Sequence, residues 1–116
     1  MFRLIIGICI LAGTLLLTVS ARAGTYYVAA TGSDANTCAK AQTSSTPKKT
    51  IPAGVQCLAG GDTLIVKAGT YLNQQIKNPP PGNSSSYTTI KADPAGARPV
   101  IVPNGVNGQQ GLYCDK

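Results

Sequence analysis

The stretch GGDTLIVKAGTYLNQ, residues 60–74, decides the fold of this chain. A glycine pair opens it, a short run rich in β-branched residues follows, and a second turn at residues 68–70 ends that run. The pattern predicts one short strand between two turns. A strand this short buries little surface by itself, so the fold needs further copies of it along the chain.

The strand returns at a spacing of 24 residues, which carries IVKA at 65–68 onto TIKA at 89–92. The same step pairs Ile76 with Val100 and Pro79 with Pro103, and a further step of 24 carries residues 64–66 onto 112–114. Short strands at such a period are typical of a parallel β-solenoid, whose coils stack about 4.8 Å apart. The alternative is that a few shared residues coincide by chance in a β-rich sequence.

Strand alternation assigns the side chains of these repeats to two faces. The residues expected to point into the stack are Leu64, Val66, Thr88, Ile90 and Cys114. Those expected to point outward are Ile65, Lys67, Thr89, Lys91 and Asp115. In this arrangement Val66, Ile90 and Cys114 are neighbours in one column.

A short helix is predicted within TIPAGVQCLAGG, residues 50–61, directly before the first repeat. Thr50 serves as its N-cap, Pro52 falls in its first turn, and the glycine pair ends it. An apolar stripe follows helical spacing: Ile51, Val55 and Leu58. We expect this helix and a first strand at residues 25–29 to cover the N-terminal end of the solenoid, since its terminal edge must be blunted.

The N-terminus has the pattern of a secretory signal peptide at residues 1–23. An apolar run at 4–19 leads to SARA, in which Ala21 and Ala23 flank Arg22 as a signal peptidase requires. The run is shorter than the roughly 20 residues of a membrane span, which disfavours an uncleaved anchor. The sequence therefore predicts a protein secreted to the extracellular space or periplasm, with a capping region at 24–61 and coils at 62–116.

The charge is mildly basic, with a formal net charge of +6 over the whole chain. The lysines are scattered and there is no Trp, so no basic and aromatic surface suited to nucleic acid is expected. No basic amphipathic helix is present either, so we expect no membrane partner after signal cleavage.

Cysteine usage agrees with secretion. Cys38 lies in the loop before the predicted helix, and Cys57 lies on the side of that helix away from its apolar stripe. We expect a Cys38–Cys57 disulfide; two free thiols or a metal site are the alternatives, and the latter lacks His and CxxC ligands. Cys114 is expected as a core thiol, rather than a bridge to a residue beyond Lys116 or a reactive group.

No catalytic or metal-binding residue is predicted within this chain. It contains no His, and its four acids, Asp34, Asp62, Asp93 and Asp115, share no repeat register. A hydrolytic carboxylate pair or a calcium cluster is therefore not expected. We interpret Asp34 and Asp62 as turn residues and Gly69 as a tight bend.

Lys67 and Lys91 are the candidate substrate-binding residues. The 24-residue repeat places them outward on successive coils, where their like charges repel. An acidic polysaccharide lying across the strands would relieve that repulsion. The alternative is that Asp115 pairs with Lys91 and that Lys67 is merely solvated.

Several motifs resemble the N-terminal module of secreted right-handed parallel β-helix proteins of the pectate-lyase-like superfamily. They are TYYVAATGSDANT, TPKKTIPAGVQCLAGGDTLIVKAGTY and YTTIKADPAGARPVIV. The resemblance covers nearly all of residues 24–116 and implies an all-β, right-handed parallel β-helix with a short capping helix. It implies less about function, because that superfamily includes lyases, hydrolases and inactive coils.

The leading functional expectation from this resemblance is β-elimination of an acidic polysaccharide, with Ca²⁺ as a cofactor of the full-length protein. The rival is a non-catalytic β-helix for surface attachment or carbohydrate binding. Solenoids need about three coils and a cap at each end, whereas one cap, two coils and the beginning of a third are recognisable here. We therefore expect this sequence to be the N-terminal part of a longer protein or a truncated reading frame, with further coils C-terminal to Lys116 carrying the catalytic groups.

Overall fold

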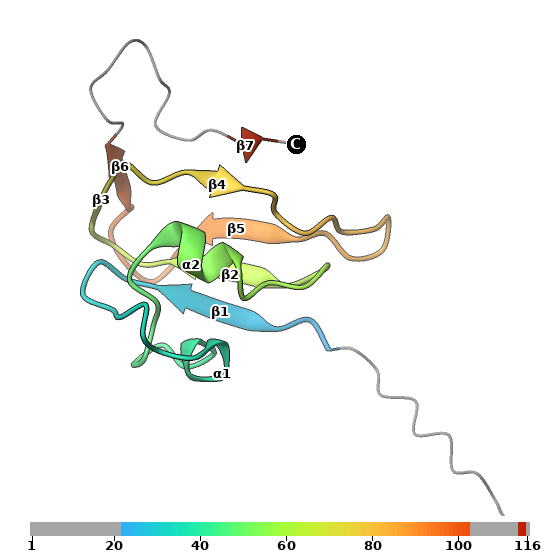
Figure 1. Cartoon of the computed structure of the whole chain (residues 1–116), viewed down its shortest axis with the longest axis horizontal. Helices are drawn as coiled ribbons and strands as arrows, with labels where there is room; N and C mark the ends of the chain where they lie inside the picture. The colour runs from blue at the N-terminus through green and yellow to red at the C-terminus, as the bar shows by residue number, and fades with distance from the viewer. Residues whose placement is uncertain (1–21, 103–113, 116) are drawn as a thin grey trace, which may run out of the picture.

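The computed structural model describes residues 22–102 and 114–115 (Figure 1). The expected signal peptide lies outside the described residues, apart from its last two. Among these described residues, the regular elements are mostly β-strands, with two short helices. In chain order the elements are β1 (Thr25–Val28), α1 (Cys38–Ala41), α2 (Ile51–Val55), β2 (Thr63–Val66), β3 (Thr70–Leu72), β4 (Ile76–Lys77), β5 (Thr89–Ala92), β6 (Val100–Val102) and β7 (Cys114–Asp115).

The described strands form three small sheets, and every pairing between strands is parallel. One sheet has the order β1-β2-β5, the second pairs β3 with β6, and the third pairs β4 with β7. Three successive strands, β2 to β4, thus pair with the next three, β5 to β7, in the same order. Two parallel neighbours need a crossover connection. Between β2 and β5, for example, the chain passes through β3 and β4, which belong to the other two sheets.

The predicted 24-residue register is wrong. Thr63 lies opposite Thr89, a step of 26 residues, whereas Thr70 lies opposite Val100 and Ile76 opposite Cys114, steps of 30 and 38. The steps differ because the loops between strands differ in length from one set to the next. Backbone pairing fixes which strands meet, and loops on the surface absorb the extra residues.

The expected column of Val66, Ile90 and Cys114 is also wrong. Ile90 lies opposite Leu64, Val66 lies opposite Ala92, and Cys114 lies opposite Ile76 in a different sheet. The inward face is nevertheless correct for β2, because Leu64 and Val66 are 0% and 4% exposed. Ile90 is half-buried and packs against the same core.

Helix α2 begins as the sequence predicts. The Thr50 hydroxyl accepts a hydrogen bond from the amide of Ala53 at 3.3 Å, and Pro52 lies in the first turn. The helix is shorter than expected and ends at Val55, with turns in place of its final residues. The predicted apolar stripe is buried, as expected: Ile51, Val55 and Leu58.

The core lies where α2 packs on β1, β2 and β4. Its buried side chains are Val28, Ile51, Val55, Leu58, Leu64, Val66, Tyr71 and Ile76. Gly54 allows the helix to approach closely, since an added Cβ would lie 2.9 Å from Leu64 Cδ1 and would also overlap Val28. In Figure 1, α2 lies across the strands between β1 and β4.

Tyr71 ties β3 to the neighbouring sheet. Its hydroxyl donates a hydrogen bond to the carbonyl of Lys67 at 2.8 Å, and its side chain is buried. This burial raises the pKa of the phenol, and the backbone amide of Ala30 offsets part of the rise. The tight bend before it depends on Gly69, whose φ of 147° favours glycine.

The outer edge of β1 is covered by the segment that precedes α2. Lys48 forms a parallel bridge with Val28, with hydrogen bonds of 2.9 Å from the Ala29 amide and 3.0 Å to the Tyr27 carbonyl. Helix α1, in a region predicted to be loop, lies next to β1 in the same part of the fold and is capped by the Thr37 hydroxyl. The expected protection of this edge is thus present, but a loop and an extra helix contribute to it.

The Cys38–Cys57 disulfide is confirmed. It joins the first residue of α1 to the turn after α2, with a Cα–Cα distance of 5.3 Å. Closing a loop of this length stabilises a fold by about 3 kcal/mol in the chain-entropy model. The bridge links the two helices, and α2 contributes Ile51 and Val55 to the buried core.

Candidate functional site

The outer face of the β1-β2-β5 sheet carries Lys91, one of the two predicted binding residues. Lys91 is exposed on β5 and lies opposite Ile65, which in turn lies opposite Tyr27. The three residues form one row across the sheet, because residues opposite each other in parallel strands point to the same face. The row provides an aromatic and aliphatic surface beside one cation.

Lys67 directly follows β2, and its ammonium group is held in place by Ser44. Its Nζ lies 2.9 Å from Ser44 Oγ and 3.3 Å from the Ser44 carbonyl. It lines a cavity of about 270 Å³ together with Asp93. This lysine therefore has a fixed position and an acidic neighbour.

The two lysines do not stack directly, contrary to the predicted register. Lys91 lies opposite Ile65, and the Asp93 amide donates to the Val66 carbonyl at 2.9 Å, which places Asp93 beside Lys67. The lysines are thus diagonal neighbours on one face, two positions apart along the strands. The alternative pairing of Lys91 with Asp115 is not supported by the register, since Asp115 lies opposite Lys77.

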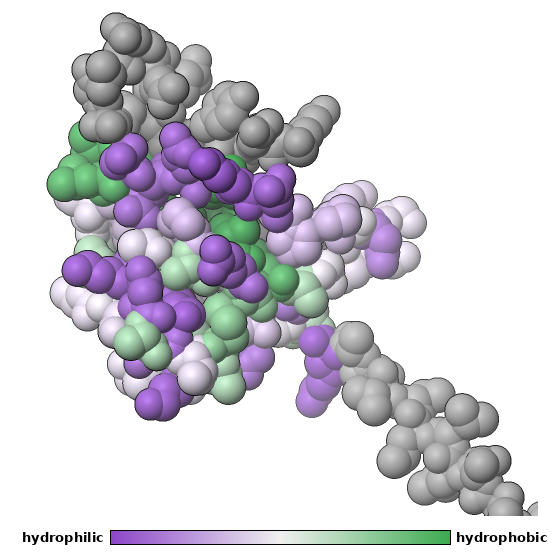
Figure 2. Space-filling view, viewed as in Figure 1, coloured by the Kyte–Doolittle hydropathy of each residue, from purple (hydrophilic) through white to green (hydrophobic). Residues whose placement is uncertain are grey.

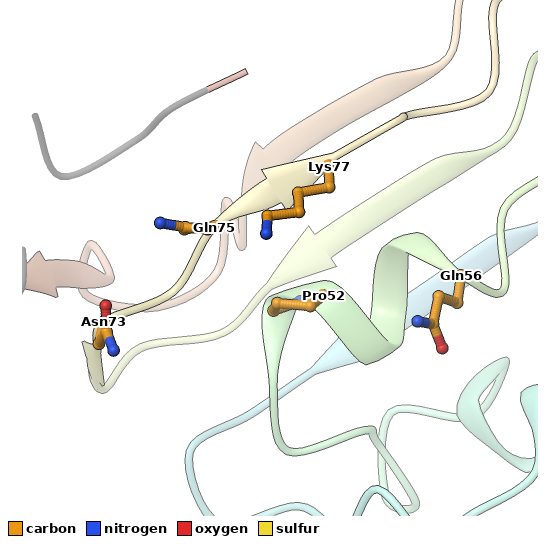
Figure 3. A pocket seen from close by; sticks show the side chains of 5 residues that line it. All are labelled: Pro52, Gln56, Asn73, Gln75 and Lys77. Carbon is orange, nitrogen blue, oxygen red and sulfur yellow. The ribbon is translucent and has the colours of Figure 1, made fainter. Parts of the chain in front are cut away.

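A second polar site lies between α2 and the segment from β3 to β4 (Figure 3). It is a cleft of about 340 Å³ lined by Pro52, Gln56, Asn73, Gln75 and Lys77. In Figure 3 the Lys77 side chain extends from β4 toward the space beside α2, from which Pro52 and Gln56 project. Amides and an ammonium group together can bind the hydroxyl and carboxylate oxygens of a sugar.

This cleft was missed from the sequence, although a signal for it exists. Asn73, Gln75 and Lys77 alternate with Gln74 and the buried Ile76, as expected for a strand with one polar face. Figure 2 shows hydrophilic residues gathered over the region of β4, and a hydrophobic area where β3 and β6 lie. The alternation predicts a polar face, but only the packing of α2 makes it one wall of a cleft.

The corner next to this cleft is held by Gln74. Its Oε1 accepts a hydrogen bond from the Ile51 amide at 3.0 Å, and its Nε2 donates to the Leu72 carbonyl at 3.0 Å. Asn73 adopts a left-handed φ of 51°, and its amide donates to the Val102 carbonyl at 2.9 Å. The wall of the cleft is thus attached both to α2 and to β6.

An apolar cavity of about 640 Å³ lies between the loop after β4 and the inner side of β5. Ile76, Tyr87 and Ile90 line it together with the three prolines at 79–81. Tyr87 is 73% exposed, which is high for so large an aromatic residue. The cavity adjoins the core through Ile76 and Ile90.

Asp34 has a structural role at the start of α2. Its carboxylate accepts hydrogen bonds from the amides of Lys49 and Thr50 at 2.8 and 2.9 Å and from the Thr50 hydroxyl at 3.0 Å. Slight burial raises the pKa of Asp34, but these hydrogen bonds and the nearby Lys48 charge outweigh it and bring the pKa below 3.8. Its oxygens are therefore engaged by the backbone.

Among residues 22–102 and 114–115, no group of three or more His, Cys, Asp or Glu residues is placed to hold a metal ion. Within the same described part, no helix has the length and apolar character needed to cross a membrane.

No protein-family model matches this chain, and no curated protein matches it either.

Proposed function

We propose that residues 24–116 are the N-terminal capping part of a secreted right-handed parallel β-helix protein that acts on an acidic polysaccharide. The observation that carries this proposal is the pairing of β2, β3 and β4 with β5, β6 and β7, all parallel and in the same order, with α2 packed against one end. Such an order is what two stacked coils of a three-sheet helix require. The resemblance to the pectate-lyase-like superfamily supports the same architecture.

The outer face of the β1-β2-β5 sheet is the proposed polysaccharide surface. The half-buried Tyr27 and Ile65 offer apolar contact for sugar rings, and Lys91 beside them offers a partner for a uronate carboxylate. Lys67 contributes a second cation on the same face, partly balanced by Asp93. A chain crossing the strands diagonally would meet both lysines.

The proposed reaction is β-elimination, as in the lyases of the resembling superfamily. In that chemistry a cation neutralises the uronate carboxylate and a basic group removes the adjacent proton. We assign these catalytic groups, and a Ca²⁺ cofactor, to further coils, because calcium needs six or more oxygen ligands. The role assigned to the described residues is to cap the coils and to bind the sugar.

Binding measurements test the proposed surface. The processed chain should bind polygalacturonate or alginate in preference to a neutral glucan, more weakly as salt increases. Each cation contributes about 0.5–1 kcal/mol, so Lys67→Ala combined with Lys91→Ala should weaken binding by roughly fivefold to thirtyfold. Lys77→Ala is the matched control, since Lys77 lies on a different sheet.

The control also separates the two candidate sites. A loss of binding in Lys77→Ala, with the double variant unaffected, would place the ligand in the cleft beside α2 and reject the sheet face. Equal binding of acidic and neutral glycans by all variants would reject the acidic substrate class.

The alternative function is a non-catalytic β-helix that binds carbohydrate or attaches to a surface. This alternative is favoured by the polar side chains at both candidate sites. They are mainly cations, amides and hydroxyls, which are suited to binding a sugar. A protein that includes the further coils decides between the two. Calcium-dependent formation of unsaturated uronate products, seen by ultraviolet absorbance, supports the lyase, whereas binding without product supports the alternative.

A further inference from the structure

Asp62 is the one polar or charged residue among the buried side chains of the described part, with 6% of its surface exposed. Its Oδ1 accepts a hydrogen bond from the backbone nitrogen of Gly24 at 2.6 Å. Its Oδ2 accepts one from the Ala59 amide at 2.7 Å. The carboxylate therefore joins the start of β1 to the turn after α2.

A buried carboxylate is costly unless a positive charge compensates it. Two backbone amides supply only partial positive charge. One of them, the nitrogen of Gly24, lies directly after the bond at which the sequence predicts signal-peptide cleavage. Cleavage would change the chemistry of that nitrogen.

Hydrolysis of the Ala23–Gly24 bond adds the hydroxyl of water to the Ala23 carbonyl carbon and a proton to the Gly24 nitrogen. The resulting amine has an ordinary pKa of about 7.7–8.0, so at neutral pH it binds a further proton and becomes an ammonium group. The donor at 2.6 Å from Asp62 Oδ1 thus changes from a neutral amide to a cation. The Asp62 carboxylate already makes this hydrogen bond charge-assisted, and after cleavage a full positive charge on the donor adds a direct attraction between opposite charges.

The side chain of residue 24 must be small for this contact to form. A Cβ added to Gly24 would lie 2.9 Å from Tyr26 Cε2 and 3.3 Å from Asp62 Oδ1. Glycine therefore lets the nitrogen approach the carboxylate in a place where a larger residue would be crowded.

We propose that the Ala23–Gly24 bond is a processing site whose cleavage completes the cap of the fold, by converting the contact of the Gly24 nitrogen with the buried Asp62 carboxylate into an ion pair. The proposal rests on the secretion that forms part of the proposed function. The mature chain gains stability that the precursor lacks. Folding of the cap is thereby coupled to release of the signal peptide.

The first measurement is the mass of the chain secreted by a bacterial host. It should correspond to a start at Gly24. A start at any other residue overturns the proposal without affecting polysaccharide binding at Lys67 and Lys91, so the two proposals fail separately.

The second measurement compares the processed chain with the same chain acetylated at its α-amino group. Acetylation keeps an N–H donor on Gly24 but removes the charge. We expect the unfolding equilibrium constant at pH 7 to rise about tenfold on acetylation, which corresponds to about 1.4 kcal/mol. A change of less than about twofold overturns the proposal.

Asp62→Asn tests the partner of the ammonium group. In this variant acetylation should have no effect on unfolding, since the carboxylate is gone. Asp34→Asn is the matched control, because Asp34 also accepts two backbone amides but lies at the start of α2. In the Asp34→Asn variant, acetylation should still raise the unfolding equilibrium constant about tenfold. An equal response to acetylation in both variants overturns the pairing of the Gly24 ammonium group with Asp62.

A pH titration needs no substitution and remains valid if Asp62→Asn does not fold. The carboxylate raises the pKa of the ammonium group in the folded chain, so the advantage over the acetylated chain is present below about pH 8 and is lost as pH rises through the raised value. Tyr26 and Asp62 face this nitrogen in both chains, and Arg22 leaves with the signal peptide. An advantage that does not fall at high pH overturns the proposal.

Discussion

Two regions of the fold differ sharply in how well they are covered. At the covered end, where α2 packs on β1 and β2, Val28 and Leu64 are 0% exposed and Ile51 of α2 is 1% exposed. In the sheet that pairs β3 with β6, Leu72 is 65% exposed and Val100 is 55% exposed. Strands of the same kind thus have very different surroundings.

The difference teaches where the stability of this fold lies. β1 is an edge strand, paired with β2 on one side. A capped helix, a disulfide and the bridge at Lys48 all stabilise the region around it. At β5, the half-buried Ile90 adjoins an apolar cavity. We therefore expect substitutions at the covered end to cost much more free energy of unfolding than substitutions at the other.

The largest effect is expected for Leu64→Ala. Removing a fully buried leucine leaves a cavity between α2 and the sheet and should lower the free energy of unfolding by about 3 kcal/mol. Its neighbour across the sheet, Ile90, is half-buried, and Ile90→Ala should cost about 1 kcal/mol. Denaturant unfolding of both variants measures the contrast, and equal losses would contradict it.

Removal of the disulfide comes next. Cys38→Ser combined with Cys57→Ser should lower the free energy of unfolding by about 3 kcal/mol, because the unfolded chain is no longer constrained. Mild reduction of the native protein should have the same effect on its denaturation midpoint. A double variant as stable as the parent would show that the covered end does not depend on this bridge.

Gly54→Ala should cost about 2 kcal/mol, since its Cβ would overlap Val28 and Leu64 and force α2 away from the sheet. Gly96→Ala is the control at the other end. A Cβ there would make only ordinary contact, at 3.9 Å from Ala68 Cβ, so little change is expected. Thermal unfolding of the two variants should differ by several degrees, and similar melting would refute close packing at Gly54.

The smallest effect is expected for Asp34→Asn. Loss of the carboxylate weakens the hydrogen bonds at the start of α2 and should cost about 1 kcal/mol at pH 7, after allowance for solvent screening. The pKa of Asp34 is lower in the folded chain, so its contribution is present above the unfolded pKa and is lost as pH falls through the folded value. The difference between parent and variant should therefore vanish in acid, and a constant difference would argue against it.

Local features of the cap were predictable from the sequence. Thr50 and Pro52 start α2, the stripe from Ile51 to Leu58 is buried, and Cys38 bonds to Cys57. Helix α1 was not predicted, because a four-residue helix is too short to show helical periodicity. The candidate lysines were found on the outer face, but in a different relative position from the one expected.

The sequence by itself determined the short strands, the start of α2 and the inward face of β2, because these follow from local backbone preference and side-chain alternation. Only the tertiary structure decided that Leu64 lies opposite Ile90, that Gln56 and Lys77 share a cleft, and that the Gly24 nitrogen meets Asp62. The physical reason is that parallel strands pair through their backbones across connections of unequal length. No local preference encodes which residues then become neighbours.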